Sequence, residues 1–459
     1  MRGKREHEIR TYPDRCRRRG RRIRSGVAAL LAVVVLAFCG LQQSAQAVPV
    51  RGYTGWSILM CKVSDNAAEP HTAGWLRNFF TDSGAGTGGM YDYFNSISAG
   101  AVQIRNSNAA GWYTMPYTLA EEQGRDRWTR FQDCVNAAKA GGYTVPAGHR
   151  TIVVTNVGID WWGAGGAIYL DGTGLGSVSV AHEMLHGYGL GHSFSNDTGY
   201  RNAPWSAPGE YDDPWDEMSA ANVYGSGTGG TYGNTQPVGL VGYQLDKLGW
   251  VDHGRVAVAP AGWSSHTLTS FQSDDGSHPK LLRVPIGSDP FHYYTVEFTR
   301  KLGYSAGIPN DVVLIHEIVN GTPYLQRTLD GGARLPVTSL NANGDSISTS
   351  ISGGTATVTV YSATSVAIYG PNTCVSGYVW RDGDYRDYTC VAPATRSQAA
   401  ADNAARYSRW VSGPYGPHTC ISGYVWREAW PGDDVCVTPA VRSQASADNA
   451  AAPSRVLHP

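Results

Sequence analysis

The stretch that decides the fold reads Ser177-Val-Ser-Val-Ala-His182-Glu183-Met-Leu-His186-Gly-Tyr-Gly189-Leu-Gly-His192. Residues four apart share one face of a helix, so His182 and His186 can present two imidazoles to one metal ion. Glu183 stands beside the first histidine, where its carboxylate can take a proton from a water molecule. The pattern therefore predicts a helix that carries two metal ligands and a general base.

The residues after this helix supply a third ligand. Gly189 permits a sharp turn, often at positive φ, that brings His192 back towards the other two histidines. Three neutral imidazoles leave the fourth tetrahedral position open, which is typical of a catalytic zinc site. We therefore expect one zinc ion, Zn²⁺, at this position.

Upstream of the helix, residues 48–250 mix strands and helices. Apolar, β-branched runs predict strands, and apolar residues three or four apart predict helices. The expected strands are Trp56–Lys62, Ala101–Arg105, Thr151–Thr155 and a Gly-rich edge strand at Gly163–Leu170, and the expected helices are Trp75–Phe80, Met90–Phe94 and Trp128–Ala140.

Two further segments follow. Residues 251–369 contain short alternating strands and no helical period, which favours a β-sandwich-like accessory domain. Residues 370–459 hold a tandem repeat, because Gly370–Arg381 recurs as Gly416–Arg427 at an offset of 46 residues. The predicted architecture is therefore α+β in residues 48–250, then a sandwich, then two small repeats stapled by disulfides.

Residues 1–47 are typical of an export signal. The first 26 residues hold eleven Lys and Arg against three acids, and an apolar run of about 15 residues, Val27–Leu41, follows them. Ala45-Gln-Ala47 is the small-x-small pattern that signal peptidase recognises. A membrane-spanning helix needs roughly 20 apolar residues. We therefore expect cleavage after Ala47 and a secreted chain with no membrane anchor after cleavage.

The charge balance changes when this segment is removed. The whole chain has 37 Lys and Arg against 38 Asp and Glu, a formal net charge of −1. Residues 48–459 keep 26 basic and 35 acidic residues, a net charge of about −9. An acidic chain avoids polyanions, which excludes nucleic acid as a partner. The hydrophobic share of 42% excludes a disordered tail protein.

Six cysteines follow residue 47, and an even number in an exported chain is typical of disulfides. Four of them form two pairs of equal spacing in the repeats, which leaves the other two as a pair by elimination. The predicted bonds are Cys61–Cys134, Cys374–Cys390 and Cys420–Cys436.

The string H-E-x-x-H-x-x-G-x-x-H resembles the signature of the metzincin zinc endopeptidases. Its flanks look most like those of secreted gametolysin-like and immune-inhibitor-A-like peptidases. The gametolysin-like group fits better, because the other group usually lacks the third histidine in this form. The resemblance covers residues 48–250 and, more loosely, the sandwich. The flanking stretches are Tyr91–Phe94, Gly111–Met115, Tyr211–Asp216 and Leu245–Trp250.

This resemblance implies hydrolysis of peptide bonds in protein or peptide substrates, with Glu183 as general base and then general acid. Metzincins close the site with a methionine in a tight turn, for which Met218 is the candidate. They bind the substrate along an edge strand, for which Ile168–Leu170 is the candidate. Some members use a tyrosine near the methionine turn. Tyr224 does not match that spacing, so the role is unassigned.

Two features allow two interpretations each. The acidic loop Glu210–Glu217 offers oxygen ligands that suit calcium, Ca²⁺, and it equally fits solvated acids beside a zinc cleft. In the repeats, Tyr378 with Trp380 and Tyr424 with Trp426 fit either a mini-core over the disulfide or a stacking surface for a cell-wall or matrix polymer.

The leading hypothesis is a secreted zinc endopeptidase. The alternative is a secreted adhesion or polysaccharide-binding protein with a catalytically idle metzincin scaffold. Glu183 separates the two hypotheses, because an idle scaffold has no reason to keep the base beside three ligands.

Overall fold

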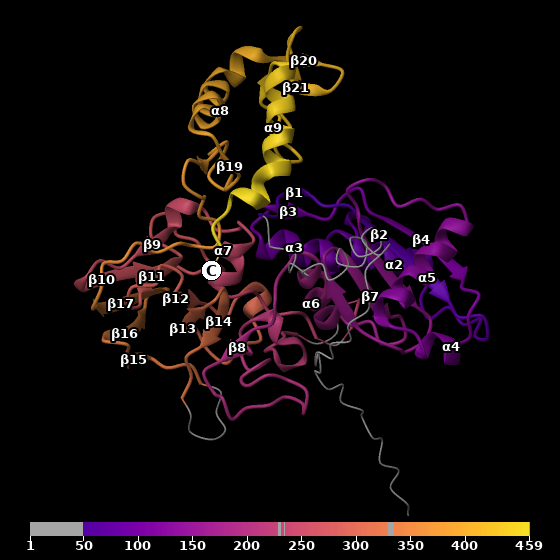
Figure 1. Cartoon of the computed structure of the whole chain (residues 1–459), viewed down its shortest axis with the longest axis horizontal. Coiled ribbons are helices and arrows are strands. Elements are labelled where there is room, and N and C mark those ends of the chain that lie inside the picture. The colour runs from indigo at the N-terminus through magenta and orange to yellow at the C-terminus, as the bar shows by residue number, and fades with distance from the viewer. Residues whose placement is uncertain (1–48, 228–230, 234, 329–334, 459) are drawn as a thin grey trace, which may run out of the picture. The chain divides into compact units, whose positions relative to one another are not determined.

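The computed structural model describes residues 49–458, apart from 228–230, 234 and 329–334. The predicted export signal, residues 1–47, lies outside the described residues. Within the described part, no helix is both long and apolar enough to cross a membrane. The described residues contain both helices and strands, so the expectation of a mixed α+β protein is confirmed (Figure 1).

The first part of the chain is built on one sheet with strands β2 (Trp56–Lys62), β4 (Asn108–Thr114), β5 (Arg150–Thr155), β6 (Trp162–Ala164) and β7 (Ala167–Asp171). The strand order is β4-β2-β5-β7-β6. All neighbours are parallel except β6, which is antiparallel to β7. Successive side chains of a strand point to opposite faces, and a sheet covered on both faces needs apolar residues on both. This explains the uninterrupted apolar runs of β2 and β5.

Helices cover the two faces of this sheet: α2 (Ala73–Phe80), α3 (Met90–Ile97), α4 (Leu119–Gln123), α5 (Arg127–Ala140) and α6 (Ser177–Gly187). Ile58 and Met60 of β2 belong to the core that includes α2, α3 and α6. Leu59 and Cys61 belong to the opposite core, which includes α5. The predicted disulfide Cys61–Cys134 is present and ties β2 to α5.

The predicted edge strand was wrong. Gly163–Leu170 forms a hairpin, because Gly165 and Gly166 adopt φ values of 56° and 86° that turn the chain between β6 and β7. β7, which contains Ile168–Leu170, therefore lies inside the sheet, between β5 and β6. The edge beside α6 is β6.

Short elements connect these parts. The predicted strand Ala101–Arg105 is reduced to β3 (Val102–Gln103), which pairs with β1 (Gly52–Tyr53). The strand is short because the chain turns away at Asn106, where φ is 57°. The short 3₁₀ turns are η1 (Asp82–Gly84), η2 (Glu217–Asn222), η3 (His253–Arg255), η4 (Gly303–Ser305), η5 (Arg406–Arg409) and η6 (Ala452–Arg455).

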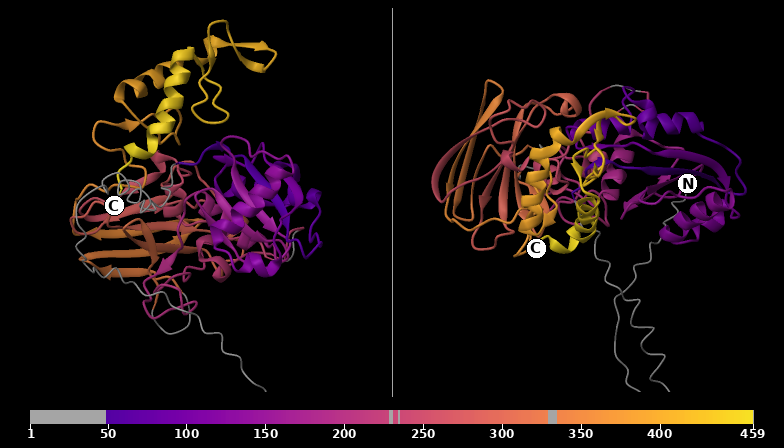
Figure 2. Two further views of the ribbon diagram at one scale, coloured as in Figure 1. Left: turned by 45° about the vertical axis from the view of Figure 1, so that its right-hand side comes forward. Right: turned by 90° about the horizontal axis from the view of Figure 1, so that it is seen from above.

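Two further sheets form two layers after the first sheet (Figure 2). One consists of β8 (Phe194–Ser195), β14 (Thr322–Leu325), β13 (Val312–Val319), β12 (Tyr293–Thr299), β11 (Leu281–Pro285) and β9 (Val256–Val258), in that order. The other consists of β10 (Gly262–Leu268), β17 (Thr355–Ser362), β16 (Asp345–Ser352) and β15 (Ser339–Ala342). Alternate apolar side chains, among them Val296, Val358 and Val360, form the core that the two layers share.

One strand of the six-stranded sheet comes from the first part of the chain. β8 follows His192 by two residues and pairs in parallel with β14. The helix α7 (Gly242–Lys247) packs on β12, and its first amide donates to the buried carboxylate of Glu297 at 2.6 Å. The segment that carries the third histidine is therefore held by the second part of the chain.

The two repeats have matching elements. The first contains β18 (Val379–Trp380), β19 (Cys390–Val391) and α8 (Pro393–Ala405), and the second contains β22 (Val425–Trp426), β23 (Cys436–Val437) and α9 (Pro439–Ala451). A hairpin of β20 (Trp410–Gly413) and β21 (Gly416–Cys420) lies between them. The disulfides Cys374–Cys390 and Cys420–Cys436 form as predicted. The two helices were not predicted.

The repeats exchange contacts reciprocally. Arg381 forms a buried ion pair with Asp387 of its own repeat at 2.6 Å and donates to Asn449 of the other repeat at 3.0 Å. The second repeat repeats this pattern with Arg427, whose contacts to Asp433 and Asn403 measure 2.7 and 3.1 Å.

Backbone hydrogen bonds link the two repeats in the same reciprocal way. The Ile421 amide of the second repeat donates to the carbonyl of Arg409, which follows the first helix. The Val375 amide of the first repeat donates to the carbonyl of Arg455, which follows the second helix. The segment after the helix of each repeat thus accepts a backbone hydrogen bond from the start of the other repeat.

Candidate metal centre

The helix α6 carries two of the three histidines. It runs from Ser177 to Gly187 and packs against β6, β7 and η2. His182 and His186 lie on the face of the helix that is directed at η2 and the following loop. His182 is 5% exposed, so a polar ring at this depth needs partners.

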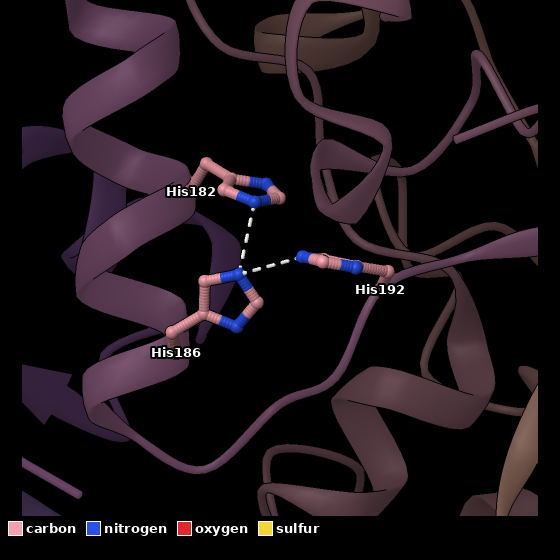
Figure 3. Close-up of side chains that lie close together, drawn as sticks. All are labelled: His182, His186 and His192. Atoms are coloured by element: carbon pink, nitrogen blue, oxygen red, sulfur yellow. Dashed lines mark hydrogen bonds between the residues drawn. The ribbon is translucent and has the colours of Figure 1, made fainter. Parts of the chain in front are cut away.

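The three imidazoles converge, as Figure 3 shows. His186 Nε2 lies 3.0 Å from His182 Nε2 and 3.1 Å from His192 Nε2. Two nitrogen ligands at about 2.0–2.1 Å from a tetrahedral zinc ion lie roughly 3.3 Å apart. The distances between the Nε2 atoms are therefore slightly shorter than those around a bound zinc ion. Among the described residues, these histidines form the one group of His, Cys, Asp or Glu side chains whose ligand atoms come together in this way.

Each ring is oriented by a bond at its other nitrogen. A ring whose Nδ1–H donates keeps the lone pair of Nε2 free for a metal ion. The partners are the Glu217 carbonyl for His182 at 3.1 Å, the Leu190 carbonyl for His186 at 2.8 Å and the Glu210 carboxylate for His192 at 2.5 Å. All three Nε2 lone pairs therefore face one point.

Burial also keeps the rings of His182 and His186 neutral. It lowers the pKa of His182 well below its ordinary value, and the neighbouring His186 lowers it further. Burial, followed by the influence of His192, lowers the pKa of His186 to about 4. A metal binds the neutral imidazole, so this donor set fits a transition-metal ion such as zinc.

Gly189 and Met218 lie at the two turns that complete the site. Gly189 has φ of 96°, and its amide donates to the His186 carbonyl, which ends the helix and reverses the chain. Met218 is fully buried in η2, directly after Glu217. Its carbonyl accepts from the Ser193 amide at 3.2 Å, so the methionine turn is bonded next to the first and third histidines.

Glu183 is buried beside His182. Its Oε2 has no hydrogen-bond partner among the residues that the structure describes. Burial raises the pKa of Glu183 to about 8, an effect that Arg127 opposes and Asp160 adds to. A carboxylate without a protein partner is available to hold a proton from a water molecule in the site.

Two contacts at the site had not been predicted. The Tyr211 hydroxyl lies 3.1 Å from His192 Nε2, and its ring packs on the His192 ring with centroids 4.4 Å apart. Burial, with Glu210 and Glu183, raises the pKa of Tyr211 to about 12, so the hydroxyl stays protonated. Tyr224 instead packs on Trp215, at 5.0 Å between ring centroids. Tyr211 precedes Met218 in the chain, whereas Tyr224, the tyrosine considered from the sequence, follows it.

The carboxylates of the acidic loop Glu210–Glu217 contact other groups of the protein. Asp212 pairs with Arg327 at 2.8 Å and Asp213 pairs with His316 at 2.9 Å. Asp216 accepts from the Ser193 hydroxyl, and Glu210 orients His192. These contacts account for four of the loop's five acids, whose carboxylates hold segments near the histidines.

No protein-family model matches the chain, and a search of curated proteins gave no match. The chemical interpretation of the site therefore rests on its geometry and on the sequence motif.

Proposed function

We propose that the protein is a secreted zinc-dependent endopeptidase of the metzincin type. The observation that carries the proposal is the set of three Nε2 atoms around one point, each ring fixed through Nδ1, with the carboxylate of Glu183 beside them. A structural zinc site closes its fourth position with a protein ligand, whereas this site offers three.

The residues fit the cofactor. His182, His186 and His192 would hold one zinc ion. When bound, zinc supplies a Lewis acid that lowers the pKa of water towards about 7 and polarises a carbonyl group.

The chain's own groups then have distinct roles in adding water across an amide bond. Glu183 takes the proton from the attacking water and passes it to the nitrogen of the leaving amine as the carbon–nitrogen bond breaks. The Tyr211 hydroxyl, close to His192 Nε2, donates a hydrogen bond to the carbonyl oxygen as negative charge develops there. The edge strand β6 offers free backbone groups to which an extended substrate adds as a further strand.

Secretion is proposed on related grounds. Three disulfides favour an oxidising compartment, and residues 1–47 have the pattern of an export signal. The acidic net charge of the remaining chain supports proteins and peptides, rather than nucleic acid, as partners.

The test uses residues 48–459 on casein and gelatin, with a chelator and with the Glu183→Ala variant. We expect hydrolysis that the chelator abolishes and zinc restores, and a loss of about 10²–10⁴-fold in the variant, the usual contribution of a general base. One zinc per chain should remain in Glu183→Ala and be lost in His186→Ala, with His278→Ala, at a partly buried histidine outside the site, as control. The proposal fails if the wild type hydrolyses no more than Glu183→Ala on several substrates.

A second function is favoured by one observation on the repeats. In the first repeat, Trp380 packs against Tyr388 at 4.9 Å between ring centroids and against His253, outside the repeats, at 5.6 Å. In the connection from α8 to the second repeat, Tyr407 and Tyr415 are 69% and 75% exposed. We propose that the surface that includes Tyr407 and Tyr415 binds a polymer of sugar rings. The test is a pull-down with cell-wall polysaccharide. We expect it to retain the wild type but not the double variant Tyr407→Ala/Tyr415→Ala.

A further inference from the structure

A cavity of about 580 Å³ shares a wall with the metal centre. His186 and the turn Gly189–Gly191 line one side, and the end of β6, Gly163–Gly165, lines another. The remaining walls come from the six-stranded sheet, from α7 and from the last residues that the structure describes. A group bound in this cavity therefore lies beside both a metal ligand and the edge strand.

The cavity contains one permanent charge. Lys247, the last residue of α7, is the one Lys, Arg, Asp or Glu side chain among the described residues that line it. No ion pair or hydrogen bond of its ammonium group is found within the described part of the chain. The adjacent Asp246 is not available, because it pairs with Arg283.

An unpaired ammonium group in a partly enclosed place is costly, and a negatively charged ligand removes that cost. Burial lowers the pKa of Lys247, with no charged neighbour to oppose the effect. The cavity lining also includes apolar and aromatic side chains. Phe291 and Tyr369 contact each other at 5.4 Å between ring centroids and can cover the methylene groups of a ligand.

We propose that this cavity is a specificity pocket for a carboxylate of the peptide substrate, which the ammonium group of Lys247 binds while the aromatic walls cover the aliphatic part. The inference rests on the proposed function and adds a substrate class to it. The carboxylate has two sources, an acidic side chain within a peptide or the free carboxyl end of a peptide.

The experiment measures binding to the full chain in the inactive Glu183→Ala background, so that no turnover is needed. The probes are fluorescein-labelled Ala/Gly octapeptides with an amidated end, in which a single Glu or its Gln match is placed at each position in turn. A second pair has no acidic side chain and carries either a free or an amidated carboxyl end. Anisotropy titrations are run with and without zinc.

We expect one Glu position, or the free carboxyl end, to bind about tenfold or more tightly than its neutral match, as a charge-assisted hydrogen bond requires. Lys247→Met should remove this preference, Lys247→Arg should keep it, and Lys247→Glu should reverse it. Lys139→Met, which removes an exposed lysine at the end of α5, is the matched control and should change nothing.

Two results separate the pocket from the proposed function. If the wild type hydrolyses proteins but the acidic and neutral probes bind equally, the pocket is wrong and the peptidase proposal stands. If no substrate is hydrolysed but Lys247 still sets a preference for carboxylates, the pocket stands and the peptidase proposal fails. A preference that Lys247→Met leaves intact also overturns the pocket, provided that the variant melts like the wild type.

Discussion

Each of the three histidines owes its ring orientation to a different part of the chain. His182 is held by η2, His186 by the turn that ends α6, and His192 by the side chain of Glu210. Helical spacing was enough to predict that His182 and His186 share a face, and the turn at Gly189 to predict that His192 approaches them. It could not predict Tyr211 or Glu210, whose positions depend on how a long loop folds back.

A buried carboxylic acid outside the site provides a test at the same scale. Glu122 is fully buried with neither carboxylate oxygen bonded to a described residue, and burial, with Asp133, raises its pKa to about 7. Arg125 and Arg130 oppose this shift, and Glu121 adds to it. The folded state therefore holds a proton that the unfolded state has lost between about pH 4.5 and pH 7.

Stability should consequently fall as the pH rises through this window. Between pH 4.5 and pH 8, the unfolding free energy of the wild type should fall by up to about 3 kcal/mol more than that of Glu122→Gln. Urea denaturation at several pH values measures it. The exposed Glu69→Gln is the control, and parallel curves for Glu122→Gln and wild type would contradict the prediction.

At the scale of elements, the contact between β6 and α6 sets the width of the site. A Cβ atom at Gly163 would lie 2.4 Å from the Glu183 carbonyl oxygen and 3.0 Å from His186 Cβ. The apolar runs of β2 and β5 predicted these strands well, since local pattern and burial agree there. The sequence pattern does not predict the hairpin of β6 and β7, because the positive φ of Gly165 and Gly166 leaves no mark on the apolar pattern.

Gly163→Ala should push the edge strand away from the helix. We expect a clear loss of zinc affinity and of hydrolysis, because both the base and a ligand lie on the displaced helix face. Competition with a chromogenic chelator measures the affinity. Gly254→Ala, at a glycine with open space around it and no positive φ, should leave the affinity unchanged. Equal affinities for the two variants would show that the contact can relax.

The repeats allow a prediction about two elements at once. Arg381→Met leaves Asp387 buried without its partner, which is expected to cost about 3–5 kcal/mol. Since Arg381 also donates to Asn449, amide hydrogen exchange should rise in both α8 and α9. The exposed pair Arg442–Glu428 supplies the control, for which Arg442→Met should cost less than about 1 kcal/mol. Faster exchange in α8 alone would contradict the reciprocal contact.

At the scale of the whole molecule, the site depends on residues far along the chain. β8 pairs with β14, and the buried pairs Asp212–Arg327 and Asp213–His316 join the loop around His192 to the six-stranded sheet. The sequence pattern predicted a change of character near residue 250, because strand and helix periods are local signals. It could not predict these long-range pairs, which depend on tertiary packing.

A chain that ends at Trp250 should therefore lose the metal centre. Removing the six-stranded sheet takes away Arg327 and His316, the ion-pair partners of Asp212 and Asp213, and separates β8 from β14, so we expect low solubility and less than one zinc per chain. Elemental analysis and near-ultraviolet circular dichroism check this. A shortened chain that binds one zinc with the affinity of the full chain would show that the first part folds alone.

The reciprocal closure of the repeats also fixes an order of events during synthesis. The first repeat receives its backbone partner from Arg455 and its last amide contact from Leu457, which donates to the Thr373 carbonyl. A chain made from its amino end finishes residues 370–415 long before these partners exist. The first repeat must therefore wait, incomplete, until Arg455 and Leu457 have left the ribosome, and a premature stop in the second repeat before Arg455 disables both.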